Sequence, residues 1–359
     1  MTSIVKYGVM IFILIIIVVA FFYLKNPANS TSKISISNKS AIVNMNITNA
    51  PANSIYCIAN NTTAVIYAPV SPSGIGMWIK TNSYDPVTYR NYCTSYNSTL
   101  YCLNTYSNTT NYATIQPNGN LSAWQNGSAF PLSTYQCTSY NGYIYCIGHG
   151  NIVPPYNSTY YAQLTKNGIG TWKQTTSFPS FPLNSYHSPY SQGIYFISSC
   201  SAYNNSIYCI AFGPSLNISE GVYVAYAHIS NTGISAWNAS QINSSYETVL
   251  ADQCFTYNNY IYCPGRNESI YASLSNITKW KVTTGVFPNS GPLGSLACMA
   301  KNGYMYCIYS YLNEPNNTYI PGTKYVEMAS YANISQQGIG KVYSTSAPIS
   351  PSYNTCVIK

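Results

Sequence analysis

Cysteine is the residue type through which this sequence could do the most chemistry. Cys137 and Cys146 close a ten-residue stretch, Cys-Thr-Ser-Tyr-Asn-Gly-Tyr-Ile-Tyr-Cys. Its centre, Asn141-Gly142, is a strong signal for a two-residue type I′ hairpin turn, because both turn residues need a positive φ. Counting outward from that turn places Cys137 opposite Cys146 on a non-hydrogen-bonded pair, where facing side chains lie closest. Thiols in that position can be oxidised to a disulfide with little distortion of the hairpin.

The same spacing and the same turn chemistry occur five times along the chain. The central residues are Asn97-Ser98, Asn141-Gly142, Asn204-Asn205, Asn258-Asn259 and Asn302-Gly303. Free thiols at core positions would not keep every cysteine pair in register with a turn. We therefore predict five hairpin disulfides: Cys93–Cys102, Cys137–Cys146, Cys200–Cys209, Cys254–Cys263 and Cys298–Cys307. Disulfides in such number indicate an oxidising compartment.

Acidic, basic and metal-ligating residues are scarce. The chain of 359 residues has only 7 Asp and Glu and 3 His, and charged residues make up 6% of it. The formal net charge of +8 rests on 15 scattered Lys and Arg, so no nucleic-acid footprint is present and no nucleic-acid partner is expected. We find no catalytic constellation, no metal site and no cofactor site. We therefore predict that the protein is not an enzyme.

An apolar run near the N-terminus predicts a membrane anchor. Residues 7–24 read YGVMIFILIIIVVAFFYL, about the length that spans a bilayer as a helix, and no small-residue cleavage site follows. We predict an uncleaved single-pass transmembrane helix over residues 1–25 and a polar stalk over residues 26–54. Lysines flank both ends of the run, so the cysteines and glycosylation sequons, rather than the positive-inside rule, place the large C-terminal part outside the cell. The alternative is a pilin-type leader cut after Gly8.

A longer unit repeats from Ile55 onward with a period of roughly 44 to 63 residues, which in a strand-rich chain points to propeller blades. Each unit opens with a cysteine hairpin and continues with a Tyr-Ala strand. After a turn that often contains Gly it ends with a strand led by Trp, which Val342 replaces in the last unit. Four short strands per unit are what a blade needs. The repeated aromatic residues are Tyr67, Tyr112, Tyr161, Tyr226, Tyr271 and Tyr331, with Trp78, Trp124, Trp172, Trp237 and Trp280.

Two half-hairpins at the ends of this region complete the count of blades. Residues 54–57 have the pattern of a second half without a first, and residues 353–356 have the pattern of a first half without a second. Joining them forms a sixth blade from both chain ends, with Cys57–Cys356 locking the ring. We therefore predict an all-β fold over residues 55–359, a six-bladed β-propeller closed by its N- and C-terminal strands and preceded by the transmembrane helix.

The blades resemble kelch repeats of the galactose-oxidase-type propeller. The resemblance is carried by Ile-Tyr-Cys-Ile-Gly (144–148), Tyr-Tyr-Ala (160–162) and Gly-Ile-Gly-Thr-Trp (168–172). The paired glycines of the kelch motif remain only in part, as Gly148 and Gly150 around His149. The resemblance implies a kelch-like fold and a binding role, because kelch propellers mostly bind partners and only some are enzymes.

Two enzymatic propeller chemistries can be compared with the residues present. A sialidase-like site needs an arginine cluster, whereas the chain has only Arg90 and Arg266 and lacks the Asp-box pattern. A galactose-oxidase-like copper site needs two His, two Tyr and a free Cys for a cross-link. All 12 cysteines are assigned to predicted bridges, so the cross-link has no donor. His228 lies on a predicted strand, where a packed or solvated histidine is the default.

Aromatic residues outside the repeat are the better candidates for recognition, because most repeat aromatics are expected to pack between blades. The candidates lie in the longest insertions, which project from the ends of a propeller, where binding sites usually lie. Aromatic side chains there could stack on sugars or bury at a protein contact. The candidate binding residues are Tyr156, Tyr186, His187, Tyr190, Tyr311 and Tyr319.

Asn-X-Ser/Thr sequons are dense, and some arise by chance in a chain of this composition. We predict a glycoprotein, with the candidate acceptors Asn108, Asn126, Asn157, Asn217, Asn243, Asn267 and Asn316. The predicted function is a membrane-anchored extracellular binding or adhesion module that recognises a protein or a glycan. A glycan-active surface enzyme on a degenerate kelch scaffold and a structural component of the cell envelope stay open as alternatives. The sequence does not predict the oligomeric state.

Overall fold

A computed structural model describes residues 53–59, 64–84, 91–104, 108–150, 158–179, 196–212, 222–242, 253–265, 268–283, 287, 293–312, 325–348 and 351–359. The predicted transmembrane anchor and the predicted stalk up to residue 52 lie outside these residues. Within the described ranges, no helix has the length and apolar character needed to cross a membrane.

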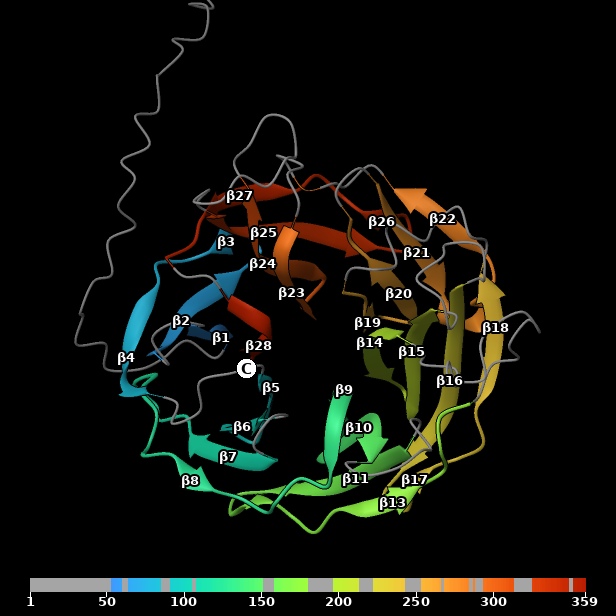
Figure 1. Ribbon diagram of the computed structural model, residues 1–359. Helices are drawn as coiled ribbons and strands as arrows, with labels where there is room; N and C mark the ends of the chain where they lie inside the picture. Colours follow the sequence, from blue (N-terminus) through green and yellow to red (C-terminus); the bar gives the residue numbers. More distant parts are fainter. Residues whose placement is uncertain are drawn as a thin grey trace, which may run out of the picture. The chain divides into compact units, whose positions relative to one another are not determined.

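The described strands form six antiparallel sheets that follow one another around a ring (Figure 1). We call these sheets blades 1 to 6 in chain order. The first strand of each blade lies nearest the centre of the ring, and the fourth strand lies at the outer rim (Figure 1). The described residues therefore form the predicted all-β, six-bladed β-propeller.

Blades 1 to 3 occupy the blue and green part of the ring in Figure 1, with the red β28 joining blade 1. Blade 1 contains β28 (Pro351–Ile358), β1 (Ser54–Ala59), β2 (Ala64–Ser71), β3 (Gly74–Ile75) and β4 (Ile79–Tyr84). Blade 2 contains β5 (Asn91–Tyr96), β6 (Thr99–Asn104), β7 (Thr109–Thr114) and β8 (Gln125–Asn126). Blade 3 contains β9 (Leu132–Tyr140), β10 (Tyr143–Gly150), β11 (Ser158–Thr165), β12 (Gly168–Ile169) and β13 (Lys173–Thr175).

Blades 4 to 6 complete the ring. Blade 4 contains β14 (Phe196–Tyr203), β15 (Ser206–Phe212), β16 (Val222–Ser230), β17 (Gly233–Ile234) and β18 (Asn238–Ile242). Blade 5 contains β19 (Phe255–Tyr257), β20 (Tyr260–Cys263), β21 (Ser269–Ser273), the 3₁₀ helix η3 (Leu274–Asn276) and β22 (Trp280–Thr283). Blade 6 contains β23 (Leu293–Lys301), β24 (Tyr304–Leu312), β25 (Tyr325–Ser335), β26 (Gly338–Ile339) and β27 (Tyr343–Ser346).

Four blades have five strands rather than the predicted four. The extra strand is a Gly-Ile dipeptide that pairs with the last two residues of the third strand, as Gly168-Ile169 does with Leu164 and Thr165. A tight turn folds the chain directly back on itself there, and the fourth strand then pairs further along the same neighbour. The prediction missed these dipeptides because they are too short to show a strand pattern.

The five hairpins have the predicted register. In blade 3, Tyr143 faces Tyr140 and Cys146 faces Cys137. Both turn residues have positive φ, 48° at Asn141 and 78° at Gly142, as a type I′ turn requires. The Cα atoms of bonded cysteines lie 4.1–4.2 Å apart, which fits non-hydrogen-bonded pairs. All five predicted hairpin disulfides are present.

The chain ends close the ring as predicted. Strand β28 pairs with β1, and Cys356 lies opposite Cys57. The two residues form the sixth disulfide across a sequence separation of 299. The backbone N–H of Lys359 donates to the carbonyl of Ser54 at 2.9 Å, so the pairing continues to the last residue. Among the described residues no cysteine is free.

The hydrophobic core is divided into six clusters, and each lies between two neighbouring blades. Alternation along each strand supplies both sides of a blade. Ile144 and Cys146 pack toward blade 2, whereas Tyr145 and Ile147 pack toward blade 4. One cluster joins blade 6 to blade 1, so apolar packing continues around the whole ring.

The two ends of the ring differ because consecutive strands are antiparallel. The connections from the first to the second strand and from the third to the fourth lie at one end, which we call the turn end. The second strand ends, and the third begins, at the opposite end of the ring, which we call the loop end. The fourth strand of each blade also ends there, and the first strand of the next blade begins there. Strand β1 starts at the turn end, because Ile55 pairs with Ile358 at the end of β28.

Candidate functional site

The repeated tyrosines form the contacts between neighbouring blades, which we call seams. In the hairpin motif Ile-Tyr-Cys, in which Leu100 and Met305 replace Ile in two blades, the tyrosine hydroxyl donates to a backbone carbonyl in the third-to-fourth-strand turn of the next blade. Tyr101 donates to Thr165 at 2.7 Å, and Tyr145 donates to Ser230 at 2.9 Å. The equivalent bonds are Tyr56 to Gly119 (3.4 Å), Tyr262 to Ser335 (2.9 Å) and Tyr306 to Ser71 (2.9 Å).

Burial changes the acidity of these hydroxyl groups. Loss of hydration raises the pKa of Tyr56, Tyr145 and Tyr262 far above the ordinary value, and raises the pKa of Tyr306 to about 12. Neighbouring tyrosines add to the effect, as Tyr304 does for Tyr306. These phenols stay neutral at physiological pH and act as hydrogen-bond donors in the seams.

A glycine in the turn accepts the tyrosine of the preceding blade. In every blade except blade 5, a tyrosine of the preceding Tyr-Ala strand lies against this glycine; a Cβ added at Gly168, for example, would lie 2.8 Å from the ring of Tyr112. Gly168 also has a φ of 109°, which favours glycine. The same arrangement brings Gly74 to Tyr331, and Gly338 to Tyr271.

Tryptophan and the Phe-Pro phenylalanines complete the outer part of the seams. Phe130 of blade 2 packs edge-on against Trp172 of blade 3, with ring centroids 4.7 Å apart. Phe178 of blade 3 does the same with Trp237 of blade 4, at 4.9 Å. The prediction that most repeat aromatics pack between blades is therefore confirmed.

The innermost strands are joined by polar side chains from one blade to the next. Ser201 and Thr256 share a hydrogen bond of 2.8 Å between blades 4 and 5. Gln136 donates to the carbonyl of Ser198 between blades 3 and 4 at 2.9 Å, and the Ser95 hydroxyl donates to the carbonyl of Ile358 at 2.9 Å. The bonds of Gln136 and Ser95 use backbone carbonyls along the inner edges of the sheets, whereas that of Ser201 joins two side chains.

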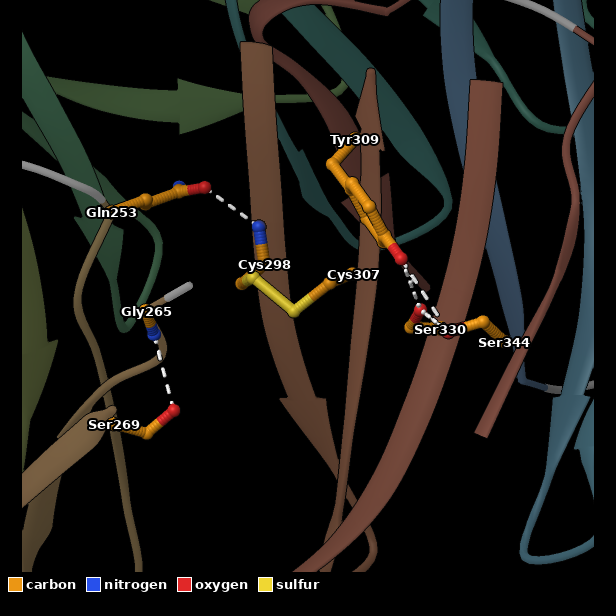
Figure 2. The surroundings of a disulfide bond; sticks show 8 residues. All are labelled: Gln253, Gly265, Ser269, Cys298, Cys307, Tyr309, Ser330 and Ser344. Carbon is orange, nitrogen blue, oxygen red and sulfur yellow. Dashed lines mark hydrogen bonds between the residues drawn. A yellow bond between two sulfur atoms is a disulfide. The ribbon is translucent and has the colours of Figure 1, made fainter. Parts of the chain in front are cut away.

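Figure 2 shows this arrangement around the Cys298–Cys307 disulfide. The backbone N–H of Cys298 donates to Oε1 of Gln253 from blade 5 at 2.6 Å (Figure 2). On the other side of the hairpin, the hydroxyl groups of Tyr309, Ser330 and Ser344 gather within hydrogen-bonding distance (Figure 2). Hydroxyl and amide groups of this kind hold neighbouring strands together.

The described titratable residues do not gather. No three His, Cys, Asp or Glu residues come close enough to hold a metal ion in the part of the chain that the structure describes. His228 is exposed on β16, as a solvated strand residue. The absence of an enzymatic function remains a prediction, because five of the seven acidic residues lie outside the described ranges.

The candidate binding residues are not tested by this structure. Tyr156, Tyr186, His187, Tyr190 and Tyr319 lie outside the described residues. Only the backbone of Tyr311 is described, where it pairs with Leu293 and Val326 near the loop end of blade 6. The strands that flank these positions all end at the loop end.

Two of the candidate glycosylation acceptors are described. Asn126 is exposed on β8 at the outer rim, and its Oδ1 accepts from Asn111 at 2.9 Å. Asn108 is half-buried with a φ of 54°, and its Oδ1 is buried without a hydrogen-bond partner. Exposure therefore favours Asn126 over Asn108. The acceptors outside the described residues are Asn157, Asn217, Asn243, Asn267 and Asn316.

These features define a β-propeller with a rigid, disulfide-linked frame. No protein-family model and no curated protein matches the chain. Solved structures with a similar fold include AztD from Citrobacter koseri, at 7% identity and a TM-score of 0.42, covering 85% of this chain and 86% of that one. A protein from Lactobacillus plantarum has 7% identity and a TM-score of 0.45, covering 86% of this chain and 99% of that one.

Proposed function

We propose that this chain is a binding module of the outer cell surface, anchored by one N-terminal transmembrane helix. The module recognises a protein or glycan partner through the loop end of a kelch-type propeller. It has no catalytic activity, and N-glycans are carried by candidate acceptors away from the turns between paired strands, such as the exposed Asn126 at the outer rim. Oxidation of twelve cysteines into six disulfides supports an oxidising location outside the cytoplasm.

The observation that carries the proposal is the difference between the two ends of the ring. At the turn end, each tight hairpin turn contains only two residues between paired strands, and the longest connection, from β7 to β8, contains 10. At the loop end, 20 residues separate β13 from β14, and 12 residues separate β24 from β25. Long connections between rigid strands are where binding residues concentrate, because the scaffold does not need them for packing.

The kelch relationship is supported by the motif residues in blade 3. Ile144 and Tyr145 pack into two different seams, and the ring of Tyr112 from blade 2 lies directly against Gly168. The aromatic residues of the insertions have no such place in the repeat. Tyrosine combines a large apolar face with a polar hydroxyl, which suits both sugar stacking and a protein contact.

Binding of the full-length chain in lipid nanodiscs to a glycan array and to whole cells tests this function. The test variant is Tyr156→Ser/Tyr186→Ser/Tyr190→Ser, and the control is Tyr343→Ser, which removes a tyrosine exposed to 49% at the outer rim. We expect the test variant to bind about tenfold more weakly or worse, because aromatic anchors dominate most interfaces. The control should bind like the unaltered protein.

Three results would contradict the proposal. Equal binding by the test variant and the unaltered protein would show that these three tyrosines do not contribute to binding. Cleavage of an array glycan assigns the protein to the glycan-active enzymes. Polymerisation of the chain without any ligand favours a structural role in the envelope.

A further inference from the structure

The described charged residues are distributed unevenly over the propeller. Five described lysines lie at the turn end, in or beside its turns. We call them the turn-end lysines: Lys166, Lys279, Lys301, Lys341 and Lys359. The other three described lysines are rim lysines, on the fourth strands or at their start: Lys80, Lys173 and Lys281.

The two described carboxylate side chains lie away from the turn end. Glu268 directly precedes β21, which starts at the loop end, and Glu327 is the third residue of β25, which starts there too. The five remaining acidic residues lie outside the described residues, in segments whose flanking strands end at the loop end. The described turn end therefore carries positive side-chain charge without a carboxylate side chain to offset it.

The chain also enters the ring at the turn end. Strand β1 begins at Ser54 beside Lys359, and the carbonyl of Asn53 accepts from the N–H of Val70 near the end of β2. The apolar run over residues 7–24 precedes this point in the sequence. The proposed membrane anchor is thus attached to the same end that carries the turn-end lysines.

Attachment alone does not decide which end faces the bilayer. The 28 residues from 26 to 53 can span at most roughly 90–100 Å, which leaves room for either orientation. Electrostatic attraction can decide it, because a lysine near an anionic membrane surface gains about fivefold in partitioning. Lys166, Lys279 and Lys341 are exposed; Nζ of Lys341 lies over the ring of the exposed Tyr343, 5.3 Å from its centroid.

We propose that the turn end of the propeller docks on the anionic lipid headgroups of the membrane that holds the N-terminal helix. The turn-end lysines contact the headgroups, and the loop end faces away from the membrane toward its partner. This inference rests on the proposed membrane anchor and adds an orientation to it.

Acylation of lysines by a water-soluble reagent tests the docking in the full-length chain. The chain is reconstituted in nanodiscs of phosphatidylcholine alone and in discs that also contain phosphatidylglycerol, and mass spectrometry measures the rate at each lysine. In the anionic discs at about 0.1 M salt, we expect the turn-end lysines to react at least about fivefold more slowly than in discs of phosphatidylcholine alone. The rim lysines should not change. At about 1 M salt, where the Debye length falls to about 3 Å, the protection should disappear.

Matched charge-reversal variants separate docking from general attraction. Lys166→Glu/Lys279→Glu/Lys341→Glu should remove the protection of the remaining turn-end lysines, Lys301 and Lys359. The control Lys80→Glu/Lys173→Glu/Lys281→Glu makes the same change in net charge at the rim and should preserve it.

Several results would overturn the inference. Turn-end lysines that react equally in neutral and anionic discs exclude docking, and protection that survives 1 M salt excludes its electrostatic origin. Glycans found on the exposed turn-end sequons would hold this end away from lipid; these sequons begin at Asn97, Asn204, Asn276 and Asn333. A chain that does not co-purify with the discs defeats the proposed anchor itself, whereas an inserted chain with unprotected lysines defeats only the docking.

Discussion

The seam between blades 4 and 5 is built differently from the seam between blades 2 and 3. In the 2–3 seam, Tyr101 donates to the turn carbonyl of Thr165, and Tyr112 lies against Gly168. In the 4–5 seam, the corresponding Tyr208 makes no hydrogen bond to the described turn of blade 5. It interacts with Ser206 of its own strand, as Tyr101 does with Thr99. In blade 5, the connection from the third to the fourth strand contains the 3₁₀ helix η3 rather than a glycine turn.

The difference shows what the glycine turn provides. Blade 5 has Asn276 where other blades have glycine, and the turn does not adopt a positive φ there. The 4–5 seam relies instead on aliphatic packing by Leu274 and Ile277. It also has more bonds between inner strands, since Ser199 and Ser201 accept from backbone N–H groups of blade 5. A propeller can thus replace a directional seam by an apolar one without losing closure.

Alkaline pH should reduce the stability of the protein most, because it ionises the tyrosines that donate hydrogen bonds across several seams at once. Tyrosines ionise near pH 10 in the unfolded chain, whereas burial raises the pKa of Tyr306 to about 12 and those of Tyr145 and Tyr262 further. The stabilisation is complete below pH 10 and is lost as the pH rises through the folded values. We expect cooperative unfolding above about pH 10. Circular dichroism and tyrosine absorbance should change together; gradual ionisation with intact circular dichroism would count against this account.

Removing the disulfide that closes the ring should have the next largest effect on the unfolding free energy, because only non-covalent contacts would then keep the ring closed. In the loop-entropy model, the Cys57–Cys356 disulfide is worth about 5 to 6 kcal/mol and a hairpin disulfide about 2.7 kcal/mol. Cys57→Ser/Cys356→Ser should therefore lower the unfolding free energy more than Cys137→Ser/Cys146→Ser. Denaturant melts measure both losses. Equal losses would show that closure adds nothing beyond one local bridge.

Gly168→Ala tests the glycine turn directly. The new Cβ would meet the Tyr112 ring at 2.8 Å with an unfavourable φ, so we expect a loss of about 3 kcal/mol in unfolding free energy. Gly303→Ala is the control, because Gly303 has a φ of 81° and nothing within 4 Å of the added Cβ; its loss should be about 1 kcal/mol. Asn276→Ala in the 4–5 seam should cost about 0.5 kcal/mol or less. Equal losses at Gly168 and Gly303 would show that the tyrosine contact has no effect.

Removing one hydroxyl should have the smallest effect and should sharpen the comparison most. Tyr145→Phe leaves the turn carbonyl of Ser230 without its donor and should cost about 1 to 2 kcal/mol. Tyr208→Phe removes a hydroxyl that does not cross its seam and should cost less than half of that. Thermal melts of both variants suffice. A larger loss for Tyr208→Phe would mean that the two seams have been distinguished wrongly.

Much of the frame was predictable because it depends on local spacing. The distance from Cys137 to Cys146 and the turn between them determine the hairpin register. The half-hairpins that contain Cys57 and Cys356 revealed the ring closure, because each lacks its partner strand. Both arguments need only strand periodicity and turn chemistry, and the paired registers confirm them.

The seams were less predictable because they join residues of different blades. The sequence shows that Tyr112 and Gly168 recur, but not that the tyrosine of one blade meets the glycine of the next. The presence of Asn276 in place of the turn glycine indicated that the seam at blade 5 differs. How it differs depends on packing between blades, which the sequence does not show. The candidate binding residues, such as Tyr156 and Tyr186, lie in insertions without a repeat pattern, so no periodic argument can position them.

The pairing of β28 with β1 has a consequence for biogenesis. These partner strands are separated by most of the chain, with 299 positions between the two cysteines. At ordinary rates of protein synthesis, β1 is made roughly 15 to 60 seconds before β28. During that interval the nascent chain exposes an unpaired strand edge, which is a template for association with other chains. The first blade of this protein therefore stays open to such association until the last strand has been made.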